Sequence, residues 1–474
     1  MGYIDYSLEP HSDIAFVDMK SFYASVECVE RGLHPLTTSL CVMSHGDNSK
    51  GLILASSPTF KKVFGKKNVG RAYDLPFNVH TRKFSYSNAR RQGLAITPEY
   101  IRFIEAWAKR TIFAAPRMGL YIQRNMEIQT VLQNYSPKAE VHPYSIDEGF
   151  VDLTRSLDYF APDKMMSRRN RLDLVSGKIQ RDIWKKTGVY STIGMSNANP
   201  LLAKLALDNE AKQTPTMRAN WSYEDVESKV WGIETITDFW GIGSRTEKRL
   251  NRLKIYSIKE LANSNPDLLK AEFGVMGLQL WFHANGVDES NVLEPYRPKA
   301  TGIGNSQVLP KDYYKQSDIE LVLSEMAEQV AIRLRKRQKK ATVVSIYTGF
   351  ARDVEKKSIS VQKKIDPSQS TKVLTGYVIE LFRKKYTGGA IRNIGVRFDG
   401  LVDEIYTVYS LFDDVEEIEK VERVEQVVDD IRAKFGYLSL QKATSLYENS
   451  RTVARSKLIG GHAGGGAGGL DGLA

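Results

Sequence analysis

Two adjacent carboxylates, Asp147 and Glu148, lie between apolar residues in a stretch that reads Ser-Ile-Asp-Glu-Gly-Phe-Val-Asp over residues 145–152. In a continuous strand, neighbouring side chains point to opposite faces, so this pair could not share a ligand there. Gly149 permits a turn or bulge directly after the pair. We therefore expect a strand, a tight turn and a second strand over residues 150–153, which lets both carboxylates reach one side.

A third carboxylate follows a short apolar strand near the N-terminus. Residues 13–17 read Asp-Ile-Ala-Phe-Val, and Asp18 ends the strand. Carboxylate oxygens suit Mg²⁺ bound to a phosphate-bearing substrate, and the next helix start can offer backbone N–H groups to phosphates. Each segment alone is more typical of a solvated turn or a cap. Together, Asp18, Asp147 and Glu148 are enough to bind two metal ions about 3.5–4 Å apart.

These two segments carry the motifs Asp-x-x-x-Phe-Tyr-Ala-x-Val-Glu over residues 18–27 and Ser-Ile-Asp-Glu-x-Phe-x-Asp over residues 145–152. In this order they resemble the signature of Y-family translesion DNA polymerases, in particular the UmuC-like branch of Gram-positive bacteria and their mobile elements. The resemblance extends to about residue 450. It implies template-directed, error-prone DNA synthesis, in which a nucleotide passes from a dNTP to the 3′-OH of a primer–template DNA.

The resemblance also implies a pair of Mg²⁺ ions, with Mn²⁺ as an alternative. Their ligands would be Asp18, Asp147, Glu148 and the carbonyl of Met19. One ion would activate the primer 3′-OH, and the other would steady the triphosphate and the leaving pyrophosphate. The implied fold is α+β: a right-hand polymerase with an antiparallel palm, small fingers, a helical thumb and a C-terminal α/β little finger.

An aromatic pair, Phe22 and Tyr23, is implied to contact the nucleotide. Both lie early in a helix expected over residues 21–31, with Ser21 as a plausible N-cap. The resemblance makes Tyr23 a steric gate that collides with the 2′-OH of a ribonucleotide, although its position alone fits a core aromatic equally well.

Basic residues of two further helices are implied to bind the triphosphate. Lys61 and Lys62 lie on a fingers helix opened by Ser57 or Thr59, and this segment lacks the Tyr and Arg of the DinB branch. Either lysine can replace that Arg as a point charge, and Arg71 is a further basic candidate. Lys204 lies in the second turn of a helix capped by Asn199.

A helix-hairpin-helix is indicated over residues 236–250, where Gly241 and Gly243 flank one apolar residue. Such a turn exposes backbone N–H groups that bind a DNA phosphate without reading sequence. Arg245 and Lys248 add positive charge there. A Gly-x-Gly alone is a weak signal, but the helical pattern that follows it strengthens the prediction.

The charge is unevenly distributed along the chain, whose formal net charge is +11. Residues 301–400 carry a net charge of +9, whereas residues 401–450 carry −7. A helix beginning near Ile319 ends in a basic run that includes Arg335, Lys336 and Arg337. With strands over 342–349, 358–361 and 391–398 and a helix over 371–386, this segment is predicted to bind the DNA backbone in a salt-sensitive manner. Residues 302–304 read as a loop.

Several other segments carry weaker predictions. Residues 98–133 show one long helical pattern, and residues 418–435 an acidic amphipathic helix that folds back or binds a partner. Residues 409–414 resemble a sliding-clamp peptide that keeps the anchors Leu411 and Phe412 but has Val408 in place of the usual Gln. Clamp binding and other damage-tolerance subunits are therefore expected partners.

The resemblance divides the chain into palm (1–30 and 96–215), fingers (31–95), thumb (216–287), linker (288–300), little finger (301–412), acidic helical tail (413–459) and disordered Gly-rich tail (460–474). Only two cysteines occur, so no disulfide framework is implied, which fits a reducing cytoplasm. No signal peptide is evident, and no apolar run is long enough for a membrane span.

Three alternative functions are compatible with parts of this pattern. A nucleotide cyclase with a palm-like metal site would have neither the helix-hairpin-helix nor the basic C-terminal segment. A non-catalytic DNA-binding subunit of a damage-tolerance complex would have a defective set of acids, whereas Asp18, Asp147 and Glu148 are all present. The DinB-type branch of the same family disagrees with the Ser57-Pro58 fingers segment and the acidic tail.

Overall fold

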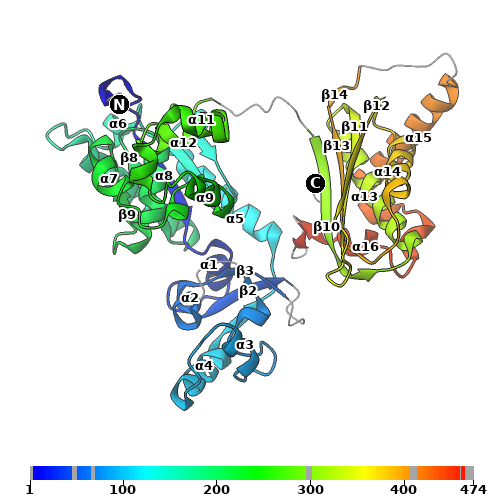
Figure 1. Ribbon diagram of the computed structural model, residues 1–474, viewed down its shortest axis with the longest axis horizontal. Helices are drawn as coiled ribbons and strands as arrows, with labels where there is room; N and C mark the ends of the chain where they lie inside the picture. The colour runs from blue at the N-terminus through cyan, green and yellow to red at the C-terminus, as the bar shows by residue number, and fades with distance from the viewer. Residues whose placement is uncertain are drawn as a thin grey trace. The chain divides into compact units, whose positions relative to one another are not determined.

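The computed structural model describes residues 4–44, 51–65, 70–294, 302–405, 414–459 and 461–464. Figure 1 shows the helices and strands with the labels used below. The chain divides into two units: unit 1 comprises Met1–Pro116 and Leu120–Pro295, and unit 2 comprises Arg117–Gly119 and Tyr296–Ala474. Each unit has a hydrophobic core of its own.

A five-stranded sheet with the order β6-β7-β1-β8-β9 lies in unit 1. Its strands are β1 (Ile14–Met19), β6 (Val141–Pro143), β7 (Glu148–Asp152), β8 (Ser191–Ser196) and β9 (Arg218–Asn220). Neighbouring strands are antiparallel, except that β8 and β9 are parallel. The mainly antiparallel sheet expected for the palm is therefore present.

Helix α8 (Pro200–Asn209) packs on this sheet. The shared apolar cluster consists of Ile14, Phe16, Phe150, Ala203 and Leu207. The helix approaches β8 so closely that a Cβ on Gly194 would lie 2.1 Å from the carbonyl oxygen of Ala203. The Asn199 side chain accepts a hydrogen bond of 3.0 Å from the Leu202 N–H, which confirms the predicted N-cap. The other helices around the sheet are α1 (Phe22–Val29), α5 (Met118–Gln133), α6 (Leu157–Phe160) and α7 (Arg168–Thr187).

Strands β6 and β7 form the expected hairpin, but its turn spans residues 144–147 and contains Asp147, whereas Glu148 begins β7. The predicted turn after the carboxylate pair is therefore wrong. The N–H groups of Tyr144 and Ser145 both donate to the Glu148 carbonyl at 3.0 Å. Gly149 lies inside β7, where a Cβ would come within 3.2 Å of the His142 carbonyl oxygen. The glycine is needed for the close approach of β6, because a side chain there would push the two strands apart.

A smaller sheet with the order β4-β3-β2-β5 forms a second layer of unit 1. Its elements are β2 (Leu40–Ser44), β3 (Leu52–Ser56), β4 (Gly70–Arg71), β5 (Ile112–Ala114), α2 (Pro58–Phe64), α3 (Tyr86–Arg91) and α4 (Pro98–Arg110). The single helix expected over residues 98–133 is wrong, because β5 divides it and pairs in parallel with β2. Ladder hydrogen bonds and burial of Phe113 against the Phe60 and Phe77 rings favour a strand there over further helix.

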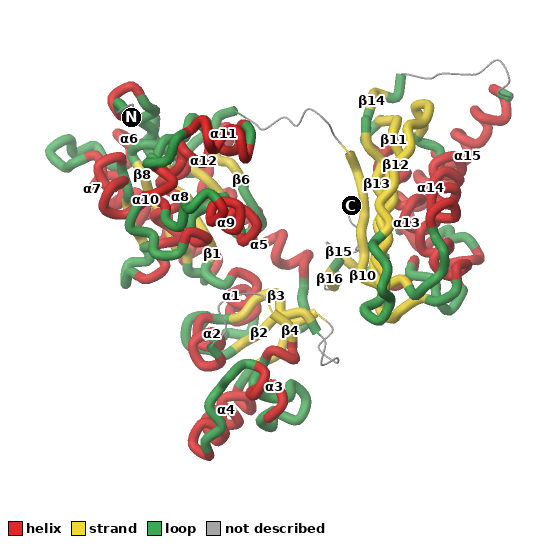
Figure 2. The backbone as a smooth tube through the Cα atoms, in the orientation of Figure 1, coloured by secondary structure: helices red, strands yellow, loops and turns green. Residues whose placement is uncertain are grey.

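Four short helices form the rest of unit 1 (Figure 2): α9 (Ser244–Arg252), α10 (Ile258–Ala262), α11 (Pro266–Phe273) and α12 (Val275–Ala284). Their buried side chains form one core with α8, which includes Leu202, Leu250, Leu261 and Leu280. Because α8 belongs to both cores, this helical region is anchored directly to the five-stranded sheet.

Unit 2 contains an antiparallel sheet with α13 (Gln316–Lys336) and α14 (Thr371–Lys385) on one face, as Figure 2 shows. The strand order is β10-β13-β11-β12, with the short β14 (Val402–Asp403) paired to β11. The four long strands are β10 (Gly302–Tyr313), β11 (Lys339–Phe350), β12 (Ile359–Ser368) and β13 (Ile391–Asp399). The loop expected at residues 302–304 is wrong, because these residues begin β10.

The C-terminal segment folds back onto unit 2. Helix α15 (Val415–Phe435) is followed by α16 (Thr452–Arg455) and the two-stranded pair β15 (Leu458–Ile459) and β16 (His462–Ala463). Arg455 is 6% exposed and donates to Gln329 of α13 and Gln307 of β10, at 2.9 and 2.7 Å. Disorder was expected from residue 460 onward, yet residues 461–464 are described and include β16; residues 460 and 465–474 lie outside the described residues.

Candidate active site

The three acids predicted from the sequence lie together at one edge of the five-stranded sheet. Asp18 of β1 and Glu148 of β7 are directly opposite each other in the antiparallel register. Side chains of opposed residues share one face, so the two carboxylates point to the same side. Asp147 immediately precedes Glu148, and its carbonyl accepts a hydrogen bond of 2.9 Å from the Met19 N–H. The strand register therefore brings the N-terminal acid to the hairpin pair.

Each carboxylate in this cluster has a partner within the protein. Ser145 Oγ donates to Asp147 Oδ1 at 2.8 Å, and Lys204 Nζ donates to Glu148 Oε2 at 2.8 Å. Lys212 Nζ lies 3.7 Å from Asp18 Oδ2. Within the described parts of the chain, no three acid, histidine or cysteine side chains are already grouped tightly enough to hold an ion.

Burial is the main cause of the shifted pKa values in this site. Burial raises the pKa of Asp18 to about 7; Lys212 opposes this shift, whereas Glu148 and Asp147 add to it. Burial also raises the pKa of Asp147, against the hydrogen bond from Ser145. A divalent cation would offset the cost of burying charged carboxylates and would weaken the repulsion between them. Three carboxylates and a backbone carbonyl supply the hard oxygen ligands that Mg²⁺ prefers.

Among the residues that the structure describes, the lysines near these acids are Lys20, Lys61, Lys204 and Lys212. The sequence analysis identified Lys61 and Lys204. Lys204 is 7% exposed, and its Nζ lies 4.4 Å from the centre of the Phe16 ring. Burial lowers the pKa of Lys61, and the Asp18 carboxylate opposes that shift. Burial also lowers the pKa of Lys20, and the Asp18 carboxylate again opposes the shift. Lys62 is exposed, so Lys61 is the lysine of α2 that lies within electrostatic reach of the acids.

Lys212 and Asp208 were missed, although the sequence carries a signal for both. They follow Lys204 by eight and four residues, the spacing that places side chains on one face of a helix. Lys212 lies in the short 3₁₀ turn η4 (Ala211–Gln213) just after α8. The opposing charges of Asp18 and Asp208 outweigh burial and raise the pKa of Lys212.

Tyr23 lies beside the acids and is held by a buried aromatic partner. Its ring stacks on that of Tyr121, with centroids 4.4 Å apart and an interplanar angle of 13°. The buried Tyr121 hydroxyl donates to Glu27 Oε1 at 2.7 Å. Phe22 is only 2% exposed and packs beside Tyr23, so it supports that ring from the core and does not reach the surface expected of a nucleotide contact.

Ser21 occupies the predicted N-cap position of α1, but without the side-chain hydrogen bond expected of a cap. Ser21 has φ 52° and ψ 48°, a left-handed conformation, and its side chain makes no capping hydrogen bond. A non-glycine residue in this region is strained by roughly 1–3 kcal/mol. The strain accompanies the abrupt change of direction from β1 into α1, and Tyr23 in the first turn of α1 lies within electrostatic reach of Asp147.

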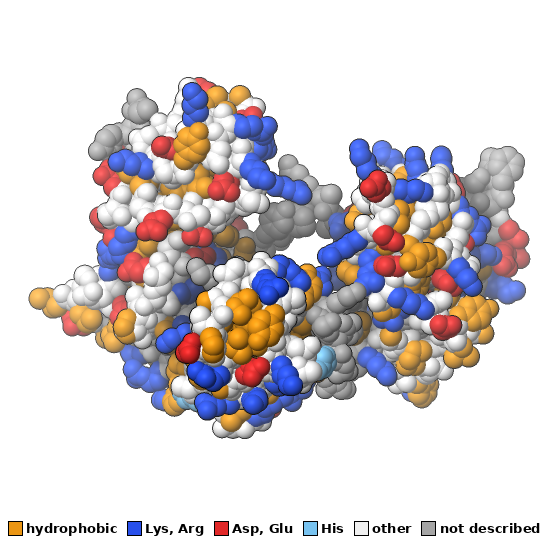
Figure 3. Space-filling view, turned by 60° about the horizontal axis from the view of Figure 1, so that its bottom comes forward, with side chains coloured by type: hydrophobic (Ala, Val, Ile, Leu, Met, Phe, Trp, Pro, Cys, Tyr) orange, Lys and Arg blue, Asp and Glu red, His pale blue; other side chains and the backbone are white. Residues whose placement is uncertain are grey.

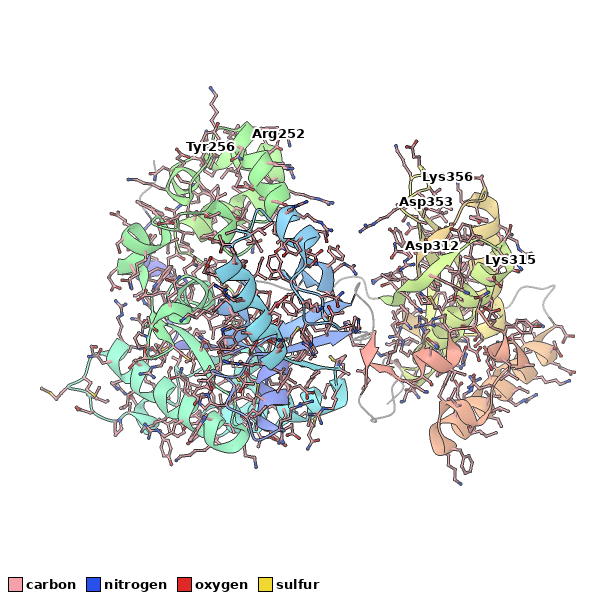
Figure 4. The ribbon with its side chains drawn as sticks, turned by 90° about the horizontal axis from the view of Figure 1, so that it is seen from below. Arg252, Tyr256, Asp312, Lys315, Asp353 and Lys356 are labelled. Atoms are coloured by element: carbon pink, nitrogen blue, oxygen red, sulfur yellow. The ribbon has the colours of Figure 1, made fainter. Side chains whose placement is uncertain are left out.

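The helix-hairpin-helix residues lie at the start of α9. Gly241 has φ 97°, a conformation that favours glycine, and Gly243 occupies the N-cap without a side-chain cap. Gly241, Gly243, Arg245 and Lys248 are all exposed. Arg252 and Tyr256, labelled in Figure 4, lie at the outer surface of the same region.

Unit 2 carries many exposed Lys and Arg side chains (Figure 3), but Arg335 is not one of them. Its side chain is 7% exposed and pairs with Glu425 and Asp429 of α15, at 3.1 and 2.7 Å. The prediction that Arg335 contacts DNA is therefore wrong: the acidic helix neutralises it. Lys336 and Arg337 are exposed. Leu411 and Phe412, the predicted clamp anchors, lie outside the described residues.

The face of the unit 2 sheet opposite α13 and α14 presents small and polar side chains. Ser306, Gly395, Tyr347 and Ser360 are in register across the four strands, and the next row contains Arg397. Tyr347 is 44% exposed and the Arg397 side chain 56% exposed. Tyr347 and Arg397 therefore project from this face, whereas Ser306, Gly395 and Ser360 leave room beside them for a phosphate backbone to approach.

Comparison with known proteins agrees with this geometry. Residues 17–208 match the impB/mucB/samB family, residues 300–409 its C-terminal domain, and residues 223–255 the HHH motif of the same family. None of the helices in the described ranges is long and apolar enough to cross a membrane.

Relatives align over nearly the whole chain. UvrX of Bacillus subtilis, named for UV-damage repair, is 34% identical over 460 residues, which cover 97% of this chain and 99% of that protein. DNA polymerase IV 2 of Bacillus subtilis is 30% identical over 95% of this chain and 98% of its own length. A Y-family DNA polymerase chimera of Dbh and Dpo4 superimposes with a TM-score of 0.60 at 20% identity, over 82% of this chain and 99% of that one, and so shares the fold. The chain belongs to the impB/mucB/samB family, the Y-family of DNA polymerases.

Proposed function

We propose that this DNA-directed DNA polymerase performs error-prone translesion synthesis by two-metal-ion nucleotidyl transfer from dNTP to a primer 3′-OH. The observation that carries the proposal is the meeting of Asp18, Asp147 and Glu148 at one sheet edge, within reach of several lysines. Burial and the repulsion among the acids raise the pKa of Asp18 and of Asp147, so a divalent cation would stabilise both carboxylates in their ionised form.

In this proposal, Asp18, Asp147, Glu148 and the Met19 carbonyl hold two Mg²⁺ ions, or Mn²⁺ in their place. When bound, the ions supply activation of the 3′-OH and stabilisation of the leaving pyrophosphate. The protein's own contribution is to fix the ligands on paired strands. Ser145, which donates to Asp147 Oδ1 at 2.8 Å, holds one carboxylate in orientation.

The incoming dNTP would lie between the acids and the lysines. Lys204 and Lys61 would neutralise the triphosphate, supported by the burial of Lys204 and the proximity of Lys61 to Asp18. Tyr23 would act as the steric gate, since the stacked Tyr121 ring prevents it from withdrawing when a 2′-OH approaches. Phe22 would support that ring from the core.

The DNA would be bound largely through its backbone. The exposed start of α9, with Gly241, Gly243, Arg245 and Lys248, would contact a phosphate of the duplex. The open sheet face of unit 2, together with Lys336 and Arg337, would bind the duplex in a salt-sensitive and sequence-tolerant way.

The domain division implied by the resemblance forms part of the proposal, with the palm at 1–30 and 96–215, the fingers at 31–95, the thumb at 216–287 and the little finger at 301–412. Leu411 and Phe412 remain the proposed anchors for a sliding clamp. Other damage-tolerance subunits and a cytoplasmic, nucleoid-associated location are proposed on the same ground.

Primer extension tests this function. Purified protein with Mg²⁺ is expected to extend a primer on an undamaged template and past an abasic site, and Tyr23→Ala should also admit ribonucleotides. The Asp147→Ala, Glu148→Ala double variant should bind the same DNA without extending it. A wild-type protein that binds primer–template but never extends it, even with a clamp, would instead be a non-catalytic DNA-binding subunit.

A further inference from the structure

Asp208 lies between two lysines of the active site and contacts both. Its Oδ2 is 3.2 Å from Lys204 Nζ, and its Oδ1 is 2.7 Å from Lys212 Nζ. Each carboxylate oxygen thus binds a separate ammonium group. The Asp208 side chain is 27% exposed, so solvent screens these contacts only in part. None of the metal or nucleotide roles proposed above involves this residue.

The same two lysines also face the proposed metal ligands. Lys204 Nζ donates to Glu148 Oε2 at 2.8 Å, and Lys212 Nζ lies 3.7 Å from Asp18 Oδ2. Each lysine is therefore shared between a carboxylate of the metal site and Asp208. Without Asp208, the strongest remaining partners of the two ammonium groups would be Glu148 and Asp18.

The sharing matters because a metal ion and an ammonium group compete for one carboxylate oxygen. A lysine held only by a metal ligand must be displaced when the cation binds. A lysine with a second, fixed carboxylate can release the metal ligand and stay in place. The two contacts are spaced four residues apart on either side of Asp208, so the α8 backbone and the turn after it set their geometry.

We propose that Asp208 is a positioning residue: it remains as the carboxylate partner of Lys204 and Lys212 when cations bind Glu148 and Asp18, and so keeps both ammonium groups aimed at the triphosphate. This inference rests on the proposed polymerase function. It assigns Asp208 a role in metal and dNTP affinity, without contact to either.

Asp208→Asn tests the inference because a pure charge effect and a loss of positioning would change the dNTP KM in opposite directions. If Asp208 acted only through its charge, removing that charge would make the site more positive and tighten dNTP binding. If it positions the lysines, the dNTP KM should rise about five-fold, the scale of a partly exposed ion pair, with a smaller change in kcat. Asp208→Glu, which keeps the charge on the same helix face, should recover most of the loss.

A second readout does not depend on turnover. Mn²⁺ binding, measured by electron paramagnetic resonance of the free protein without DNA or dNTP, should weaken about five-fold in Asp208→Asn because Glu148 and Asp18 are then the only carboxylate partners named above for the two lysines, which bind them more tightly. The matched control is Asp173→Asn, which removes the 2.7 Å contact to Arg218 in the same unit, away from the acids. It should change neither KM nor Mn²⁺ binding.

The outcomes separate this inference from the proposed function. An inactive wild type would overturn the polymerase proposal itself. An active wild type whose Asp208→Asn variant melts normally but shows an unchanged or lower dNTP KM would overturn the positioning role alone. A raised KM with weakened Mn²⁺ binding, recovered by Asp208→Glu, would establish it.

Discussion

Two clusters of opposite charges in this protein use the same residue types in contrasting ways. In unit 1, Lys204 and Lys212 are shared among Glu148, Asp18 and Asp208, and the Lys212–Asp18 separation is 3.7 Å. In unit 2, Arg335 binds Glu425 and Asp429 at 3.1 and 2.7 Å and also donates to the Gln369 carbonyl at 2.9 Å.

The clusters differ in how completely the N–H donors of each cation are paired with acceptors. The guanidinium of Arg335 has short contacts on several sides and is nearly inaccessible, so its charge stabilises the fold. The lysines of unit 1 are point charges that share partly exposed carboxylate partners, and burial raises the pKa of one of these partners, Asp18. In the proposed function, this cluster exchanges its internal partners for metal ions and a triphosphate, whereas the unit 2 cluster cannot open without detaching α15.

The largest effect should come from breaking the closed cluster. Arg335→Ala leaves Glu425 and Asp429 without their main partner, and we expect the docking of α15 to weaken by about 3 kcal/mol. Hydrogen exchange of the α15 amides should accelerate accordingly. Arg337→Ala, at an exposed neighbouring position, is the control and should leave that exchange unchanged. Equal exchange in the two variants would contradict the closed-cluster interpretation.

A smaller effect, on catalysis, should follow from breaking the open cluster. Lys204→Ala removes a charge that the proposed function assigns to the triphosphate, and we expect kcat/KM for dNTP to fall about thirty-fold, or about 2 kcal/mol. Lys185→Ala, on the exposed side of α7, serves as the control. If steady-state kinetics show the same kcat/KM for both variants, Lys204 is merely a structural partner of Glu148.

The smallest effect concerns the pH dependence of unit 2. Glu328 is buried, which alone would raise its pKa, but Lys442 and Arg432 outweigh burial and hold the pKa below its ordinary value. A depressed folded-state pKa gives stability that is present above the unfolded value near 4.5 and lost as the pH falls through the folded value. Glu328→Gln should therefore cost about 1 kcal/mol at pH 7 and progressively less in acid.

Chemical unfolding at pH 7 and under acid conditions checks that sign. The stability difference between wild type and Glu328→Gln should shrink on acidification. A difference that grows as the pH falls would mean that the carboxylate is stabilised in its protonated form, against the ion pairs with Arg432 and Lys442 at 2.9 and 3.0 Å.

The contrast also explains what the sequence could predict. The sequence motifs identified Asp18, Asp147 and Glu148 as candidate metal ligands because residue spacing and the ends of apolar strands can be read from local sequence. In the structure, the pairing of β1 with β7 brings these acids together. The turn was misplaced because a glycine that permits a turn equally permits a close strand approach, and only the position of His142 distinguishes the two.

The remaining differences between prediction and structure come from contacts between segments that are far apart in the sequence. Arg335 has the same local sequence character as Lys336 and Arg337, yet α15, which begins 80 residues later, neutralises it. Similarly, β5 interrupts a helical pattern because β2 offers a strand partner. Asp208 and Lys212 had a readable helical spacing, but nothing local indicates that this face meets the carboxylates.

The most direct test of the central claim is a count of bound Mn²⁺ in a complex with primer–template, a dideoxy-terminated primer and dNTP. Wild type should bind two ions, and Asp147→Asn should lose at least one, whereas Asp152→Asn, farther along β7, should retain both. Equal Mn²⁺ binding by Asp147→Asn and wild type would contradict the assignment of Asp18, Asp147 and Glu148 as the metal site.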